Sequence, residues 1–92
     1  MPQVFRIGVY VIYFWSNEGI PNEPIHVHVA KGHPIKNGTK IWISKDGKCS
    51  VEHNKSKIPN FQLNYIIRLI EARIDEIKEM WIERFGDINY KM

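Results

Sequence analysis

Two of the chain's four histidines stand one residue apart in the stretch EPIHVHV, at residues 23–29. Side chains alternate between the two faces of a strand, so His26 and His28 point to one face while the valines beside them point to the other. Because imidazole titrates near pH ~6.5, two neighbouring rings can supply a general base and a general acid at neutral pH. The sequence therefore predicts a candidate catalytic pair at His26 and His28, with the carboxylate of Glu18 as a third candidate group.

The same two histidines suit a metal ion. A His-x-His sequence on a strand presents two nitrogen ligands to one ion, as is common in zinc sites. No spacing singles out a third ligand, which has four candidates: Glu18, Glu23, His33 and His53. A divalent metal such as zinc, bound by His26 and His28, is thus one alternative to metal-free acid–base chemistry. A pair of histidines that only faces water is another.

Basic and aromatic residues outside this stretch suggest an anionic ligand. The candidates for holding a phosphate are Arg6, Lys31 and Lys40. The indole of Trp42 can stack on an unpaired base, as aromatic side chains do in proteins that bind single strands. Trp15 and Trp81 lie in apolar patterns, and we expect both in the core.

Charge is unevenly distributed along the chain. The net charge is +3, yet residues 1–60 contain eight Lys and Arg against four acids, whereas residues 61–92 contain five against six. A basic excess confined to one part of a domain favours an anionic partner for that part, and solubility alone is the other explanation. The single cysteine, Cys49, excludes an internal disulfide, and we expect an inert buried thiol.

Five predicted strands position these side chains. Runs of β-branched and aromatic residues indicate the first three, with Gly8 turning the chain between the first two. Two alternating runs flank Asp46-Gly47, a pair typical of a two-residue type I′ hairpin turn. The strands are expected at residues 4–7, 9–15, 26–31, 39–44 and 48–53. Prolines and polar residues predict a loop over residues 16–25.

The C-terminal third predicts a single helix over residues 60–85. Its apolar residues follow spacings of three and four, which place them on one face: Leu63, Ile67, Ile70, Ile74, Ile77 and Trp81. Asn60 is the expected N-cap and Gly86 the expected stop. Such a helix is roughly 37 Å long, more than the width of so small a domain, so we expect it to overhang the sheet or to meet a partner.

Together these elements predict the α+β class: an antiparallel sheet of about five strands packed on one long C-terminal helix. Residues 54–60 connect sheet and helix, and residues 86–92 form a short tail. Alternation directs Ile41, Ile43, Cys49 and Val51 towards the helix. The helix-free face then carries His26, His28, Lys40, Lys48 and Trp42. We expect this face to be open to solvent, so that replacing both histidines by alanine costs little stability.

No apolar run approaches the ~18 residues that a membrane helix needs. The first residues show no signal-peptide pattern. We expect one soluble cytoplasmic domain over residues 1–92, with no membrane partner.

Four stretches, in order, resemble a family of small bacterial proteins, the domain-of-unknown-function family 4160: YVIYFWSNEG, EPIHVHVAKG, TKIWISKDGKC and NKSKIP. The specific part is Ser16-Asn17-Glu18 followed by Pro24-x-His26-Val27-His28-Val29. The family more often has two prolines before the first histidine, so Ile25 departs from it, and His53 stands where a smaller polar residue is expected.

The resemblance implies a site centred on Asn17, Glu18, His26 and His28. Asn17 and Glu18 either bind a ligand or fix the loop by hydrogen bonds to the imidazoles. Family genes often lie beside a gene for another small domain, in an arrangement like a toxin–antitoxin pair. This implies a small cognate protein as partner and an RNA or translation target. A homo-oligomer formed through the long helix is the alternative partner, and a small histidine- or metal-dependent phosphodiester hydrolase at His26 and His28 is the alternative function.

Overall fold

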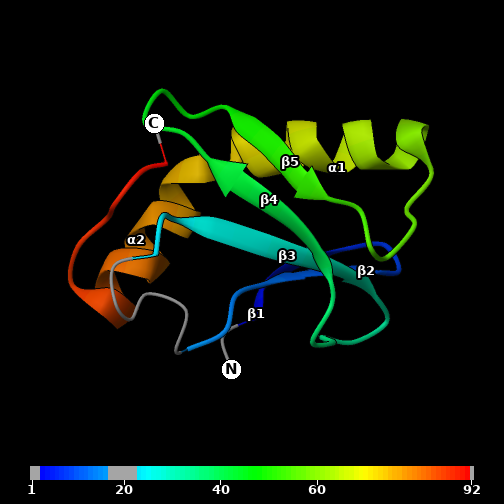
Figure 1. The fold of residues 1–92 in the computed structure, drawn as a ribbon, viewed down its shortest axis with the longest axis horizontal. Coiled ribbons are helices and arrows are strands. Elements are labelled where there is room, and N and C mark those ends of the chain that lie inside the picture. The colour runs from blue at the N-terminus through cyan, green and yellow to red at the C-terminus, as the bar shows by residue number, and fades with distance from the viewer. Residues whose placement is uncertain (1–2, 17–22, 92) are drawn as a thin grey trace.

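A computed structural model describes residues 3–16 and 23–91 of the chain. Five strands form one antiparallel sheet in chain order, and two helices follow (Figure 1). The strands are β1 (Gln3–Ile7), β2 (Tyr10–Tyr13), β3 (His26–Lys31), β4 (Thr39–Ile43) and β5 (Cys49–His53), and the helices are α1 (Asn60–Ala72) and α2 (Ile74–Phe85). The predicted α+β class and the five-stranded antiparallel sheet are confirmed.

Both helices lie on one face of the sheet, and the main core fills the space between them (Figure 1). Alternate residues of β2, β3 and β4 point into it, as the period of two requires: Ile12, Val27, Val29, Ile41 and Ile43. Phe14, the residue after β2, continues this alternation. Trp81 is 1% exposed, so its predicted core position is confirmed. The prediction for Val51 is wrong. It lies on the edge strand β5, where its side chain is 40% exposed.

The prediction of one long helix is also wrong, because the helix breaks at Arg73 (φ −116°, ψ 27°). The amide of Arg73 donates to the carbonyl of Ile70 at 3.1 Å, three residues back, which tightens the last turn of α1. The Arg73 guanidinium lies over the ring of Phe5, 4.1 Å from its centroid. The molecule measures 33 × 25 × 20 Å, so a straight helix of ~37 Å would leave the core. The bend lets apolar residues of both helices pack into the main core.

The helix ends follow the predicted pattern at one terminus only. Gly86 adopts the left-handed conformation (φ 84°), and its amide donates to the carbonyl of Ile82, as expected for a C-terminal stop. Asn60 is the first residue of α1 rather than its cap. Pro59 occupies the cap position, and its carbonyl accepts the amide hydrogen bond of Leu63 at 2.9 Å.

The turn between β4 and β5 has three residues rather than the predicted two. The amide of Gly47 donates to the carbonyl of Ser44, and Gly47 has a φ of 83°. This pattern is a type I turn followed by a left-handed glycine. The Ser44 hydroxyl stabilises the turn, since it accepts a hydrogen bond from the amide of Lys48 at 3.0 Å and bonds to the carboxylate of Asp46.

The connector after β5 is held by a network of side-chain hydrogen bonds. The amide oxygen of Asn54 accepts from the amide of Ile58 and from the hydroxyl of Thr39, and its NH₂ group donates to the carbonyl of Ile58. Ser56 exchanges two further bonds with Thr39 and donates to the carbonyl of Val29. The stretch NKSKIP therefore fixes the route from sheet to helix.

None of the helices among the described residues is both long and apolar enough to cross a membrane.

Candidate functional site

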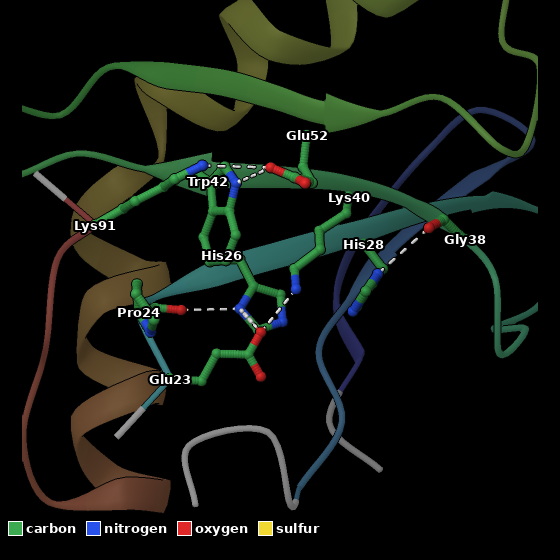
Figure 2. Close-up of polar contacts among 9 residues, drawn as sticks. All are labelled: Glu23, Pro24, His26, His28, Gly38, Lys40, Trp42, Glu52 and Lys91. Carbon is green, nitrogen blue, oxygen red and sulfur yellow. Dashed lines mark hydrogen bonds and ion pairs between the residues drawn. The ribbon is translucent and has the colours of Figure 1, made fainter. Parts of the chain in front are cut away.

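His26 and His28 project from β3 to the helix-free face, as alternation predicts. Their ring centroids lie 5.1 Å apart with the planes at 88°. The antiparallel register places Trp42 of β4 opposite His26 and Lys40 opposite His28. The sheet thus brings the predicted pair together with two of the predicted binding residues (Figure 2).

The expectation that this face is open to solvent is wrong. His26 is 0% exposed and His28 is 6% exposed. A second, smaller core covers this side of the sheet, made of Val11, Tyr13 and Ala30 with the half-buried Trp15 packed against it. His28 stacks on Tyr13, with ring centroids 5.5 Å apart.

The connection between β3 and β4 covers the Tyr13 side of this face. The Tyr13 hydroxyl donates to the carbonyl of Ile35 at 2.6 Å and accepts from the amide of the same residue at 3.2 Å. A loop that returns over a sheet leaves no periodic signal in the sequence, so alternation predicted the shared face correctly but could not predict its cover.

Each imidazole is oriented by a main-chain carbonyl. The Nδ1 of His26 donates to the carbonyl of Pro24 at 2.9 Å, and the Nδ1 of His28 donates to the carbonyl of Gly38 at 3.4 Å (Figure 2). A carbonyl only accepts, so Nδ1 carries a proton in each ring. This arrangement suits a structural histidine, a general base or a metal ligand, since all three require a fixed ring.

His26 also borders the main core. Its ring centroid is 5.5 Å from that of Trp42 and 5.5 Å from that of Trp81 on α2. The ring is therefore enclosed by an aromatic residue from the sheet and another from the helix layer. A side chain so placed contributes packing as well as any chemistry.

An ion pair lies beside the histidines. Lys40 Nζ is 2.7 Å from Glu23 Oε2, and the same oxygen is 3.8 Å from His26 Nδ1 (Figure 2). Lys40 also lies over the indole of Trp42, 4.4 Å from its centroid. Its charge is thus balanced within the protein.

Trp42 is held from several sides. Its Nε1 donates to Glu52 at 2.7 Å, and Lys91 from the C-terminal tail lies 4.8 Å from the indole centroid (Figure 2). Lys91 Nζ is also 3.3 Å from the Glu52 carboxylate. The hydrogen bond from Trp42, followed by the contact with Lys91, lowers the pKa of Glu52 below its ordinary value.

Other predicted binding residues lie apart from the histidines. Arg6 is on β1 and donates to the carbonyl of Gly32 at 2.8 Å. Lys31 is the last residue of β3 and is exposed. Alternation puts it on the same face of the sheet as the valines of β3, which face the helices. Asn17 and Glu18 lie outside the described residues.

A three-ligand metal group does not form among residues 3–16 and 23–91. Of the third-ligand candidates in these ranges, His33 is exposed and Glu23 pairs with Lys40. His53 accepts a hydrogen bond from the amide of Lys55 at 3.4 Å. Burial lowers the pKa of His53, and the positive charge of Lys55 adds to this shift.

Cys49, expected to be a buried and inert thiol, is half-buried. Burial raises the pKa of its thiol to about 12, and the carboxylate of Glu71 adds to the effect. A thiol with this pKa is almost entirely protonated at neutral pH and is a poor nucleophile.

The sequence did not predict the groove that lies beside Trp42. It has a volume of about 870 Å³ and is lined by Trp42, Ile43, Ser44, Lys45, Asp46, Lys48, Ser50 and Lys91. Alternation already placed Trp42, Ser44, Lys48 and Ser50 on one face. Lys91 arrives from the far end of the chain, and no local pattern could place it there.

The family model described as Domain of unknown function (DUF4160) matches residues 10–82. The chain belongs to this family. No curated protein and no solved structure matches it. The DUF4160 match includes the histidine pair, the Asn54 network and Trp81, whereas β1 and the tail residue Lys91 lie beyond it.

Proposed function

We propose that this DUF4160 protein is a cytoplasmic component of a two-gene module of the toxin–antitoxin kind, and that it acts by binding a small partner protein through α1. The observation that carries the proposal is a pair of exposed aromatic side chains. Phe61 is 75% exposed and Tyr65 is 59% exposed. Residues four apart lie on the same side of a helix, so the two rings form one patch, here called the α1 aromatic pair.

Aromatic residues on a rigid helix are effective anchors for a partner. Phenylalanine and tyrosine bury large areas at low entropic cost, and they are enriched among residues that dominate binding energy. The opposite side of α1 already packs on the core through Leu63, Ile66 and Ile70. The α1 aromatic pair is therefore not needed to attach the helix, and it is available to an apolar surface on another protein.

Binding fits the histidine geometry better than catalysis does. Both imidazoles are buried, and each is fixed by a main-chain carbonyl and by aromatic neighbours. Ring positions of this kind stabilise a fold, whereas a catalytic pair must meet its substrate.

The experiment is co-expression with the product of the adjacent gene, followed by gel filtration with light scattering. We expect a stable complex that the double variant Phe61→Ala/Tyr65→Ala loses while its denaturation midpoint stays unchanged. Val9→Ala is the matched control, since Val9 is 54% exposed on the turn between β1 and β2. Two independent monomer peaks, or a homodimer that excludes the neighbour, would contradict the proposal.

A second candidate is a histidine- or metal-dependent phosphodiester hydrolase. The observation in its favour is the hydrogen bond that Nδ1 of each imidazole donates to a carbonyl, the arrangement that orients metal-ligating histidines. Hydrolysis of bis(p-nitrophenyl) phosphate by protein purified without a histidine tag, measured with and without added zinc, tests it. Activity that His28→Asn abolishes would favour this candidate, and absence of turnover in both conditions would remove it.

A further inference from the structure

The groove beside Trp42 has a basic rim. It opens on the helix-free face, where the β4–β5 turn and the C-terminal tail meet. Three lysines line it, Lys45, Lys48 and Lys91, and one acid, Asp46. Hydrogen bonding from Ser44 lowers the pKa of Asp46, so this carboxylate stays charged and offsets one lysine only. The groove keeps a net positive charge at neutral pH.

Two of the three lysines are not held in an ion pair within the described part of the protein. Among residues 3–16 and 23–91, neither Lys45 nor Lys48 takes part in a salt bridge. Both side chains are exposed. Lys91 is paired with Glu52, but the side chains of the pair are 52% and 44% exposed, so solvent weakens the attraction and Lys91 can turn to another anion at little cost.

The interior of the groove is apolar, and Trp42 forms one wall. The indole is fixed by its hydrogen bond to Glu52, and the aliphatic part of Ile43 adds to the lining. Lys91 lies over the indole face, which is the position that a planar ligand would take. An aromatic wall, an apolar interior and a rim of lysines match an unpaired base with its phosphates.

We propose that this groove binds a single strand of nucleic acid, with one unpaired base against Trp42 and the neighbouring phosphates paired with Lys45, Lys48 and Lys91. On binding, Lys91 leaves the indole and Glu52 and pairs with a phosphate, and the base takes its place. A volume of about 870 Å³ accommodates a nucleotide. The groove is separate from the α1 aromatic pair, so the inference does not rest on the proposed function.

Base and phosphate are common to RNA and DNA, so the test uses both. Fluorescence anisotropy measures binding of a fluorescein-labelled uridine RNA of about ten nucleotides, and a thymidine DNA of the same length forms the second arm. We expect wild type to bind at low salt, with log K falling against log[salt] at a slope of about −2 for three phosphate contacts. Tighter binding of RNA assigns RNA as the ligand, and equal or tighter binding of DNA assigns single strands in general.

Variants that remove lysine charges distinguish binding in the groove from non-specific attraction to a basic protein. Lys45→Ala/Lys48→Ala should weaken binding by about tenfold or more and should reduce the magnitude of the salt slope by about 1.4. Lys36→Ala/Lys55→Ala is the matched control, because both lysines are exposed beyond the other ends of β4 and β5 and the change in charge is the same. Equal losses in the two double variants would overturn the proposal.

The base contact has its own test. Trp42→Leu should weaken binding by about five- to tenfold with an unchanged salt slope, and Trp42→Phe should retain most of the affinity. Circular dichroism should show that both variants are folded. Inorganic polyphosphate that displaces the RNA as well as an unlabelled oligonucleotide of equal charge would show that no base is bound, and the proposal would fail. Phe61→Ala/Tyr65→Ala should leave the affinity unchanged, which distinguishes this site from the protein-binding surface.

Discussion

At the scale of single residues, the histidine pair is defined by what its Nδ1 atoms contact. Nδ1 of each ring donates a hydrogen bond to a main-chain carbonyl, that of Pro24 or Gly38, and both rings lie against aromatic side chains. Burying an imidazole without such bonds costs free energy, because its polar atoms lose water. The described part of the chain leaves no buried side-chain nitrogen or oxygen without a partner. The histidines therefore act as polar core residues whatever else they do.

Replacing either histidine should reduce stability. His26→Ala and His28→Ala each remove a buried ring and leave a cavity. The carbonyl that accepted the hydrogen bond from Nδ1 also loses its donor. We expect a loss of about 2–4 kcal/mol in the free energy of unfolding for each, measured by urea denaturation. His33→Ala, at an exposed position, should stay within about 0.5 kcal/mol. Unchanged midpoints in the buried variants would restore the expectation of an open face.

Gly38 is the residue on which the cover of this face depends. A Cβ at this position would collide with the hydroxyl of Tyr13 and would lie 3.2 Å from the carbonyl oxygen of Val29. We expect Gly38→Ala to cost about 1–3 kcal/mol, measured by thermal or urea denaturation. Because the closest contact is the Tyr13 oxygen, Gly38→Ala/Tyr13→Phe should be less destabilised than the sum of the single variants. If the effects of the two substitutions on the free energy of unfolding simply added, the strain would not come from the contact with the Tyr13 oxygen.

At the scale of elements, the local hydrophobic periods were sufficient to predict the strands and the apolar face of the helices. Alternation in β3 and β4 and the spacing of Leu63 to Trp81 depend on neighbours in the sequence, so they are visible there. The break at Arg73 is not visible, because no glycine or proline marks it. It accompanies the contact of Arg73 with Phe5, and it keeps both helices within the dimensions of the molecule. The groove and the cover over the histidines were missed for the same reason, since both join segments far apart in the chain.

The connector between β5 and α1 carries local strain that glycine should relieve. Lys57 has a φ of 55°, in the left-handed region that residues with a Cβ avoid at a cost of ~1–2 kcal/mol. Its side chain is exposed, so Lys57→Gly removes the strain and no packing. We expect a gain of up to about 1 kcal/mol in the free energy of unfolding, measured in urea. Lys55→Gly, in an ordinary conformation, should give no gain, and a gain of the same size there would refute the explanation by strain.

At the scale of the whole molecule, the two proposed surfaces lie on different parts of the fold. The α1 aromatic pair belongs to the helix layer, and the basic groove belongs to the helix-free face at the β4–β5 turn. A small protein with two separate surfaces can hold a partner protein and a nucleic acid at once. Binding on one surface need not alter the other, which is why each has its own variant and its own control.

The C-terminal tail connects the core to the groove, and its removal is the test of that connection. The carbonyl of Asn89 accepts a hydrogen bond from the amide of Ile25 at 2.8 Å, while Ile88 and Tyr90 pack against the main core. A chain ending at Gly86 should lose on the order of 2–3 kcal/mol in the free energy of unfolding, because it loses this apolar burial and the support at the start of β3.

Lys91→Ala separates the tail's packing from its charge. The Lys91 side chain is 52% exposed, so this variant should stay within about 0.5 kcal/mol of wild type in urea. It should nevertheless bind the labelled RNA more weakly and with a shallower salt slope, because one phosphate contact is lost. If Lys91→Ala destabilised the fold as much as the shortened chain does, the tail would be anchored at Trp42 rather than in the core. The exchange of Lys91 between indole and phosphate would then be untenable.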